Sequence, residues 1–158
     1  MVDLICFRFM SRRTKPLKIF VIEAKDEDYA CIEQSLRLCF AEGTLVRAAS
    51  GQETLTCLEE WLLEEGELPK LILLDLNLPR SEDGLALLKD IKAMPAPSSR
   101  IPLILLSANK TAIVEAYQLG ASSYCLKPTD SLGWTTLLKA LCVYWFEVAT
   151  LPPRAVRL

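Results

Sequence analysis

The stretch LILLDLNLP, residues 71–79, decides the fold of this chain. Its first four residues are branched and apolar, and they lie between Pro69-Lys70 and a turn that contains an acid and a proline. Such a run is typical of a buried parallel strand that is covered on both faces. Asp75 follows the run directly, so we expect its carboxylate at the carboxyl end of the strand, where open α/β sheets place their functional groups. A carboxylate there can be a nucleophile or a metal ligand, although a single aspartate can also simply begin a turn.

The rest of the chain repeats this alternation of strand and helix patterns. Apolar runs predict strands at 18–22, 44–49, 71–74, 102–106 and 123–126. Apolar residues at helical spacing predict helices at about 26–40, 50–62, 84–94, 111–119 and 131–148. Because right-handed crossovers bury both faces of a parallel sheet, this order predicts an α/β fold with a doubly wound, five-stranded parallel sheet and five helices. We expect one domain over 17–148, an N-terminal extension at 1–16 and a C-terminal tail at 149–158.

Composition excludes several classes of function. The chain has 158 residues, 51% of them hydrophobic, and a formal net charge of −2, which describes a globular domain without the basic character of nucleic-acid binders. No stretch is a candidate membrane span, so we expect neither a nucleic acid nor a membrane as partner. The absence of histidine excludes Ser-His-Asp catalysis, Cys-His catalysis and histidine-bound metals within the chain. The six cysteines show no CxxC spacing, as is typical of a reduced, cytoplasmic protein.

Residues able to do chemistry follow four of the predicted strands. Glu23 follows the first strand, Asp75 the third, Ser107 the fourth and Lys127 the fifth. Because parallel strands end at one edge of a sheet, we expect these side chains to converge on one cleft. A phosphoryl group on Asp75 would need a positive charge, a hydroxyl donor and a divalent ion, which Lys127, Ser107 and a bound metal could supply. Simpler explanations exist for each residue: Ser107 could cap a helix, and Lys127 and Glu23 could be solvated charges.

These motifs together resemble the receiver domain of two-component response regulators. The resemblance is carried by the acid after the first strand, LLDLNLP at 73–79, LLSA at 105–108 and LGASSYCLKP at 119–128. It implies a flavodoxin-like fold and a signalling protein that accepts phosphate from a histidine kinase, with at most self-catalysed phosphotransfer and autodephosphorylation. It further implies that Asp75 is the phosphoacceptor, Ser107 the switch hydroxyl and Tyr124 the switch aromatic. Lys127 would pair with the phosphate and precede a cis peptide at Pro128. Mg²⁺ would be bound by Glu23, Asp75 and the backbone carbonyl of Asn77.

A finer resemblance is to the stand-alone receivers that serve cyanobacterial phytochromes. The LNLP turn, the LGASSY-KP run and the aromatic residues Tyr144-Trp145-Phe146 at the end of the last helix carry it. It implies a phytochrome as the kinase and a homodimer formed through the face of the fourth and fifth helices. The apolar residues of the last helix are numerous enough for such a face, although all of them could instead serve the core.

The chain departs from the receiver pattern in its metal site. Receivers place two adjacent acids after the first strand, and here the pair is Glu23-Ala24. Since Mg²⁺ is held by few protein oxygens, the loss of one carboxylate predicts a weakened site, which Asp26 could compensate unless it serves only as a helix N-terminal acid. The loop 78–84 is also one residue longer than usual.

Two other readings compete with a phosphorylated receiver. A degenerate pseudo-receiver would act as a phosphorylation-independent interaction module, which Ala24 favours and the intact Asp75, Ser107 and Lys127 oppose. A haloacid-dehalogenase-type enzyme also uses an aspartate at a strand end, but it needs a second acid two residues later, where this chain has Asn77.

Overall fold

The computed structural model of the chain describes residues 17–63 and 68–152. Within them, five parallel strands form one sheet in the order β2-β1-β3-β4-β5, which confirms the expected fold. The strands are β1 (Lys18–Ile22), β2 (Thr44–Ala48), β3 (Leu71–Asp75), β4 (Leu103–Ser107) and β5 (Ser123–Leu126). The proposed extension 1–16 and the tail from 153 onward lie outside the described residues.

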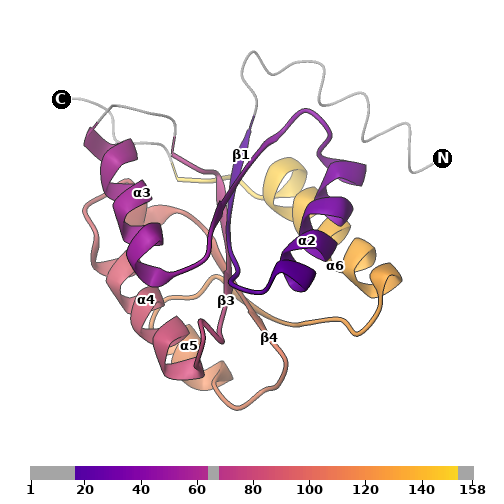
Figure 1. Cartoon of the computed structure of the whole chain (residues 1–158). Coiled ribbons are helices and arrows are strands. Elements are labelled where there is room, and N and C mark those ends of the chain that lie inside the picture. Colours follow the sequence, from indigo (N-terminus) through magenta and orange to yellow (C-terminus); the bar gives the residue numbers. More distant parts are fainter. Residues whose placement is uncertain (1–16, 64–67, 153–158) are drawn as a thin grey trace.

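Helices cover both faces of this sheet (Figure 1). The elements are α2 (Asp26–Cys39), α3 (Gly51–Leu63), α4 (Ser81–Ala93), α5 (Ile113–Gln118) and α6 (Ser131–Val143), with a 3₁₀ turn η1 (Ser98–Arg100) and a π-helical turn η2 (Tyr144–Val148). One core cluster joins alternate strand residues such as Ile72 and Leu74 to α3, α4 and α5. A second cluster joins the other alternate residues, such as Leu71 and Leu73, to α2 and α6. The molecule is therefore a three-layer sandwich.

β3 lies at the centre of the sheet because its sequence is apolar on both sides. All five of its residues are buried, Asp75 included. β3 pairs with β1 on one side, where Leu73 faces Val21, and with β4 on the other, where Leu73 faces Ile104. The central position fixes Asp75 at the middle of the carboxyl edge.

Several local expectations can be compared with the structure. Ser50 caps α3, since its Oγ accepts a hydrogen bond from the Glu53 N–H at 3.2 Å. Helix α4 begins at 81, three residues earlier than expected, and the Asp83 carboxylate accepts from the Arg80 N–H at 3.2 Å in its first turn. The last helix was expected to continue to 148, but its regular part ends at 143 and a π-helical turn follows.

The structure also corrects an expectation about proline. The cis peptide bonds of the described residues precede Pro79 and Pro97, and the bond before Pro128 is trans, contrary to what the resemblance implied. Nothing in the structure explains this difference.

Gly84 allows α4 to approach the segment that leaves β3. A Cβ atom at this position would overlap the backbone carbonyl of Leu76, which follows Asp75 and is fully buried. We expect Gly84→Ala to lower the free energy of unfolding by about 2 kcal/mol or more, because backbone cannot move aside as a flexible side chain can. Denaturant unfolding followed by circular dichroism measures this. Gly51→Ala is the matched control, since its Cβ would meet only the Leu87 methyls at 3.7 Å. Equal losses in the two variants would contradict the steric explanation.

Candidate functional site

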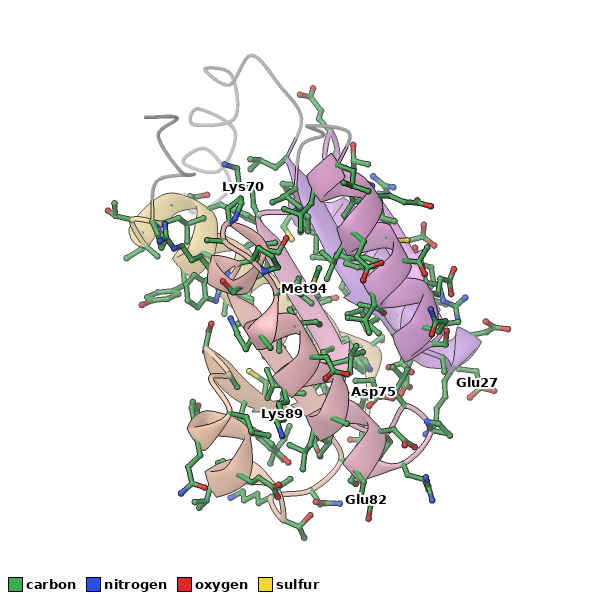
Figure 2. The ribbon with its side chains drawn as sticks, turned by 90° about the vertical axis from the view of Figure 1, so that its left-hand side faces the viewer. Glu27, Lys70, Asp75, Glu82, Lys89 and Met94 are labelled. Carbon is green, nitrogen blue, oxygen red and sulfur yellow. The ribbon has the colours of Figure 1, made fainter. Side chains whose placement is uncertain are left out.

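The four side chains expected at the carboxyl edge do converge there. Glu23 directly follows β1, Asp75 and Ser107 are the last residues of β3 and β4, and Lys127 directly follows β5. Figure 2 shows Asp75 at the same end of the molecule as Glu27 and Glu82, and far from Lys70 at the other end of β3. The fold alone accounts for this convergence, because every strand runs in the same direction.

The Lys127 ammonium lies among three carboxylates. Its Nζ is 2.8 Å from Glu23 Oε2, 2.6 Å from Asp28 Oδ2 and 3.1 Å from Asp75 Oδ1. The lysine side chain is 11% exposed, and those of Glu23 and Asp75 are 1% and 0% exposed. Three negative charges against one positive charge leave the cluster with a formal excess of two negative charges. A mostly buried excess of this kind favours the binding of a further cation.

Asp28 belongs to this cluster, and the sequence analysis did not single it out. It lies in the first turn of α2, two residues after Asp26 in an acidic run at 26–28. Its carboxylate accepts a hydrogen bond from Lys127, because α2 packs beside α6 on one face of the sheet and begins near the carboxyl edge. The helical spacing of two residues between Asp26 and Asp28 was the available signal, since it turns the two side chains toward different sides of the helix.

Asp26, named as a compensating metal ligand, lies elsewhere. Its side chain is 91% exposed, and its Oδ1 is 2.8 Å from Nη2 of Arg47 on β2. No side-chain cap of α2 is formed either. The structure thus places Asp26 in a surface ion pair, and it is Asp28 that brings a carboxylate to Lys127.

The two oxygens of Asp75 differ in their surroundings. Oδ1 accepts a hydrogen bond from the Asn77 N–H at 3.1 Å and faces the Lys127 ammonium. Oδ2 is buried and has no hydrogen-bond partner. A buried carboxylate oxygen without a partner is costly unless something binds it, so Oδ2 is the atom at which a new bond or a metal ion would be accommodated.

These residues fit a hydrated divalent ion with few protein ligands. Glu23 and Asp75 provide buried carboxylate oxygens, which are the ligands that Mg²⁺ prefers. Within the described residues, no three or more acid, cysteine or histidine side chains are grouped so as to hold a metal. Mg²⁺ tolerates such a site, because it retains several waters and uses one or two carboxylates.

Ser107 and Tyr124 lie on β4 and β5, the two strands beyond β3 at one edge of the sheet. Ser107 is fully buried, and its Oγ accepts from the Asn109 N–H at 3.3 Å, so it does not cap α5. Its carbonyl oxygen accepts from the Lys127 N–H at 2.8 Å. The Tyr124 hydroxyl donates to the Asn109 carbonyl at 2.8 Å, so the loop after β4 connects the two side chains.

The charges of the cluster shift its proton affinities. Burial raises the pKa of Glu23 above 4.5, although the hydrogen bond from Lys127 opposes this. Burial lowers the pKa of Lys127, but its hydrogen bonds to Asp28 and Glu23 and the charge of Asp75 outweigh burial and raise the pKa above 10.5. Lys127 is therefore charged at every physiological pH.

Among the described residues, no helix combines the length and the apolar character needed to cross a membrane.

The chain is similar to known proteins in sequence and in structure. The family model "Response regulator receiver domain" matches residues 19–139. Response regulator Rcp1 of Synechocystis sp. is 29% identical over 147 residues, which are 90% of this chain and 99% of Rcp1. The crystal structure of the phosphorylated cyanobacterial phytochrome response regulator RcpA has a TM-score of 0.78 and 31% identity, covering 88% of this chain and all of RcpA. The Mn²⁺-bound form of Rcp1 has a TM-score of 0.74 and 28% identity, covering 87% of this chain and all of the Rcp1 chain.

The ammonium of Lys127 offsets mutual repulsion among the three carboxylates. We expect Lys127→Met to lower the free energy of unfolding at pH 7 by about 3 kcal/mol, because it leaves buried carboxylates uncompensated. Folding raises the pKa of Lys127, so the stabilisation that its charge contributes to the natural chain is fully present just below pH 10.5. That stabilisation is lost only as the pH rises through the higher pKa of the folded state. The deficit should shrink as the pH falls, because burial raises the pKa of Glu23 and protonation of this carboxyl removes one of the uncompensated charges. Urea unfolding at several pH values measures this.

The matched control is Lys110→Met, which removes an exposed lysine from the loop after β4. A loss in Lys127→Met that is independent of pH, or no larger than in Lys110→Met, would contradict the electrostatic explanation.

Proposed function

This chain belongs to the response regulator receiver family, and we propose that it is a stand-alone response regulator that accepts a phosphoryl group on Asp75 from a sensor histidine kinase in two-component signalling. The observation that carries the proposal is the pair of Asp75 oxygens: Oδ1 is held by Asn77 and Lys127, while Oδ2 is buried without a partner. A carboxylate fixed by one oxygen presents the other as a positioned nucleophile.

The chemical step is an in-line phosphoryl transfer. Asp75 Oδ2 forms a bond to phosphorus while the bond from phosphorus to the kinase histidine nitrogen breaks, and the histidine leaves as a neutral ring after taking up a proton. The Lys127 ammonium, 3.1 Å from the other carboxylate oxygen, is placed to neutralise the transferred oxygens. The Ser107 hydroxyl supplies a neutral donor from the neighbouring strand. Both contacts stabilise charge that is absent from Asp75 before the transfer.

Divalent metal is part of this proposal. Glu23, Asp75 and the backbone carbonyl of Asn77 would hold Mg²⁺, which neutralises phosphoryl oxygens when it is bound. The site should be weak, since position 24 carries alanine. Asp28 partly compensates, because its carboxylate adds to the negative charge that attracts the ion while it also holds Lys127.

The output is proposed to pass through Tyr124. In the present state its hydroxyl is held by the Asn109 carbonyl, and Asn109 also contacts Ser107. When Ser107 turns toward a phosphoryl group, the Asn109 N–H loses its acceptor and the loop can rearrange. The tyrosine would then move inward, which would change the surface formed by α5 and β5.

That surface is the proposed dimer face, since α5 and α6 are the fourth and fifth helices of the sequence analysis. β5 is an edge strand, and edges require protection from water or from other chains. Large apolar side chains are exposed here on each element: Val114 and Tyr117 on α5, Leu126 on β5, and Leu132, Tyr144 and Val148 on α6 and η2. A second copy of the chain would cover them. Measurement of the molecular mass in solution at micromolar concentration tests this, and a monomer would contradict it.

The kinase is proposed to be a phytochrome, because the similar proteins include phytochrome response regulators. A second candidate function is phosphorylation-independent binding by a pseudo-receiver. It is favoured by Ala24 and by the complete occupation of the Lys127 ammonium by acids of its own chain.

Phosphorylation distinguishes the two functions. With acetyl phosphate or a phytochrome kinase and Mg²⁺, we expect one phosphoryl group per chain, seen as a mass increase and on phosphate-affinity gels. Asp75→Asn should abolish the signal, because an amide oxygen cannot form the acyl phosphate. The matched control Asp90→Asn, which changes an exposed acid on α4, should keep it. Phosphate that persists in Asp75→Asn would place the acceptor elsewhere, and an unmodified natural chain would favour the binding module.

Metal affinity tests the role of the two acids. By calorimetry without phosphate, we expect Ala24→Asp to tighten Mg²⁺ binding about tenfold or more and Asp28→Asn to weaken it, because each change alters the charge beside the ion. Asp26→Asn should leave the affinity unchanged, since that carboxylate pairs with Arg47. Unchanged binding in Ala24→Asp would mean that the natural chain already fills that ligand position, and weaker binding in Asp26→Asn would restore Asp26 as a ligand.

A further inference from the structure

Two cysteines far apart in sequence have their sulfur atoms in contact. Sγ of Cys39 at the end of α2 is 3.6 Å from Sγ of Cys142 in α6. The thiol of Cys39 is also within 3.6 Å of the carbonyl oxygens of Ser35 and Leu36. Among the described cysteines, Cys31, Cys57 and Cys125 make no such thiol contact. The pair lies outside the cluster around Asp75.

Neighbouring contacts hold the two helices in this register. One turn earlier on α2, the Ser35 hydroxyl is 3.5 Å from the Thr135 hydroxyl of α6. Immediately after the cysteine, the ring of Phe40 stacks on Phe146 with centroids 5.3 Å apart and planes inclined by 12°. Contacts on both sides of the sulfur pair therefore keep the thiols opposed at 3.6 Å, and the two sulfurs must approach to about 2.05 Å to form a bond.

The two thiols differ in their access to a reagent. Cys39 is half-buried, whereas Cys142 is 6% exposed. The hydrogen bond with Cys142 lowers the pKa of Cys39, and Lys139 lowers it further, while burial opposes both. A thiolate reacts with oxidants and a thiol does not, so Cys39 is the sulfur that meets a reagent first and Cys142 the one that resolves the product.

We propose that Cys39 and Cys142 form a dithiol modification site that a peroxide-class oxidant converts to a disulfide between α2 and α6. The Cys39 thiolate attacks one peroxide oxygen, so that an S–O bond forms, the O–O bond breaks and the departing hydroxide takes up a proton. The Cys142 sulfur then attacks the sulfenic acid, so that the S–S bond forms, the S–O bond breaks and a second water leaves. Both sulfurs are oxidised and one hydrogen peroxide is reduced to two waters.

The bond would affect the two helices that flank the phosphoacceptor edge. α2 carries Asp28 and α6 carries the exposed Leu132. A covalent link between α2 and α6 would restrict any shift of one helix against the other. The proposal does not rest on phosphorylation of Asp75, because it needs only the packing of α2 on α6.

Peptide mapping of the full chain tests the site. After reduction and removal of the reductant, a small excess of hydrogen peroxide should produce an intramolecular link between the peptides that contain Cys39 and Cys142, with the loss of two titratable thiols. Cys142→Ser should instead accumulate sulfenic acid at Cys39, trapped by dimedone, and Cys39→Ser should leave Cys142 unmodified. The control Cys57→Ser should form the link as the natural chain does.

A different pattern would overturn the proposal. Oxidation of Cys39 to sulfinic acid in the natural chain without a link, links that join other cysteines, or a link formed only between chains would each do so. Circular dichroism of the serine variants confirms that they are folded, and serine is close enough in size to cysteine for this comparison.

Discussion

The ammonium of Lys127 is the contact on which the functional end of the molecule depends. It contacts carboxylates of Glu23 after β1, of Asp28 on α2 and of Asp75 on β3, while its own backbone leaves β5. One side chain thus links the last strand to elements from the first half of the chain. Without that positive charge, three acids would face one another in a place with little water. In the proposed function, the same ammonium would neutralise the oxygens of a phosphoryl group on Asp75.

Much of the fold could be predicted because its determinants are local. The short apolar run before Asp75 is typical of a doubly covered strand, and the repeated alternation of strands and helices allows few topologies. The four strand-end residues followed from the fold itself. Asp28 could not be predicted in this way, because its role depends on how α2 rotates and packs against α6. The early start of α4 was missed for a similar reason: the side chain of Asp83 bonds back to Arg80, and no hydrophobic pattern reports that bond.

Ala24 leaves the site without one expected carboxylate, while Glu23, Asp75 and Lys127 are all present. Receivers carry an acid where this chain has Ala24. A third acid near Lys127, Asp28, comes instead from α2. A third negative charge is thus present near Asp75, but on a helix and not at the end of β1. The position of an acid on a helix depends on how that helix packs, whereas the position of an acid at a strand end is fixed by the sheet. The proposed Mg²⁺ site would therefore depend on the position of α2, which carries Cys39 at its opposite end.

The hydrogen bond from the Lys127 N–H to the Ser107 carbonyl has a mechanical consequence. It is the last backbone hydrogen bond between the β4 and β5 segments. It holds the backbones of the serine and the lysine together at the place where a phosphoryl group would bind. This hydrogen bond opposes sliding of β4 against β5, so the loop after β4 and the side chains are the parts left to respond to a new charge. In the proposed function, a signal would therefore begin as changes in the side-chain rotamers of Ser107 and Tyr124 beside this fixed pair of strand ends.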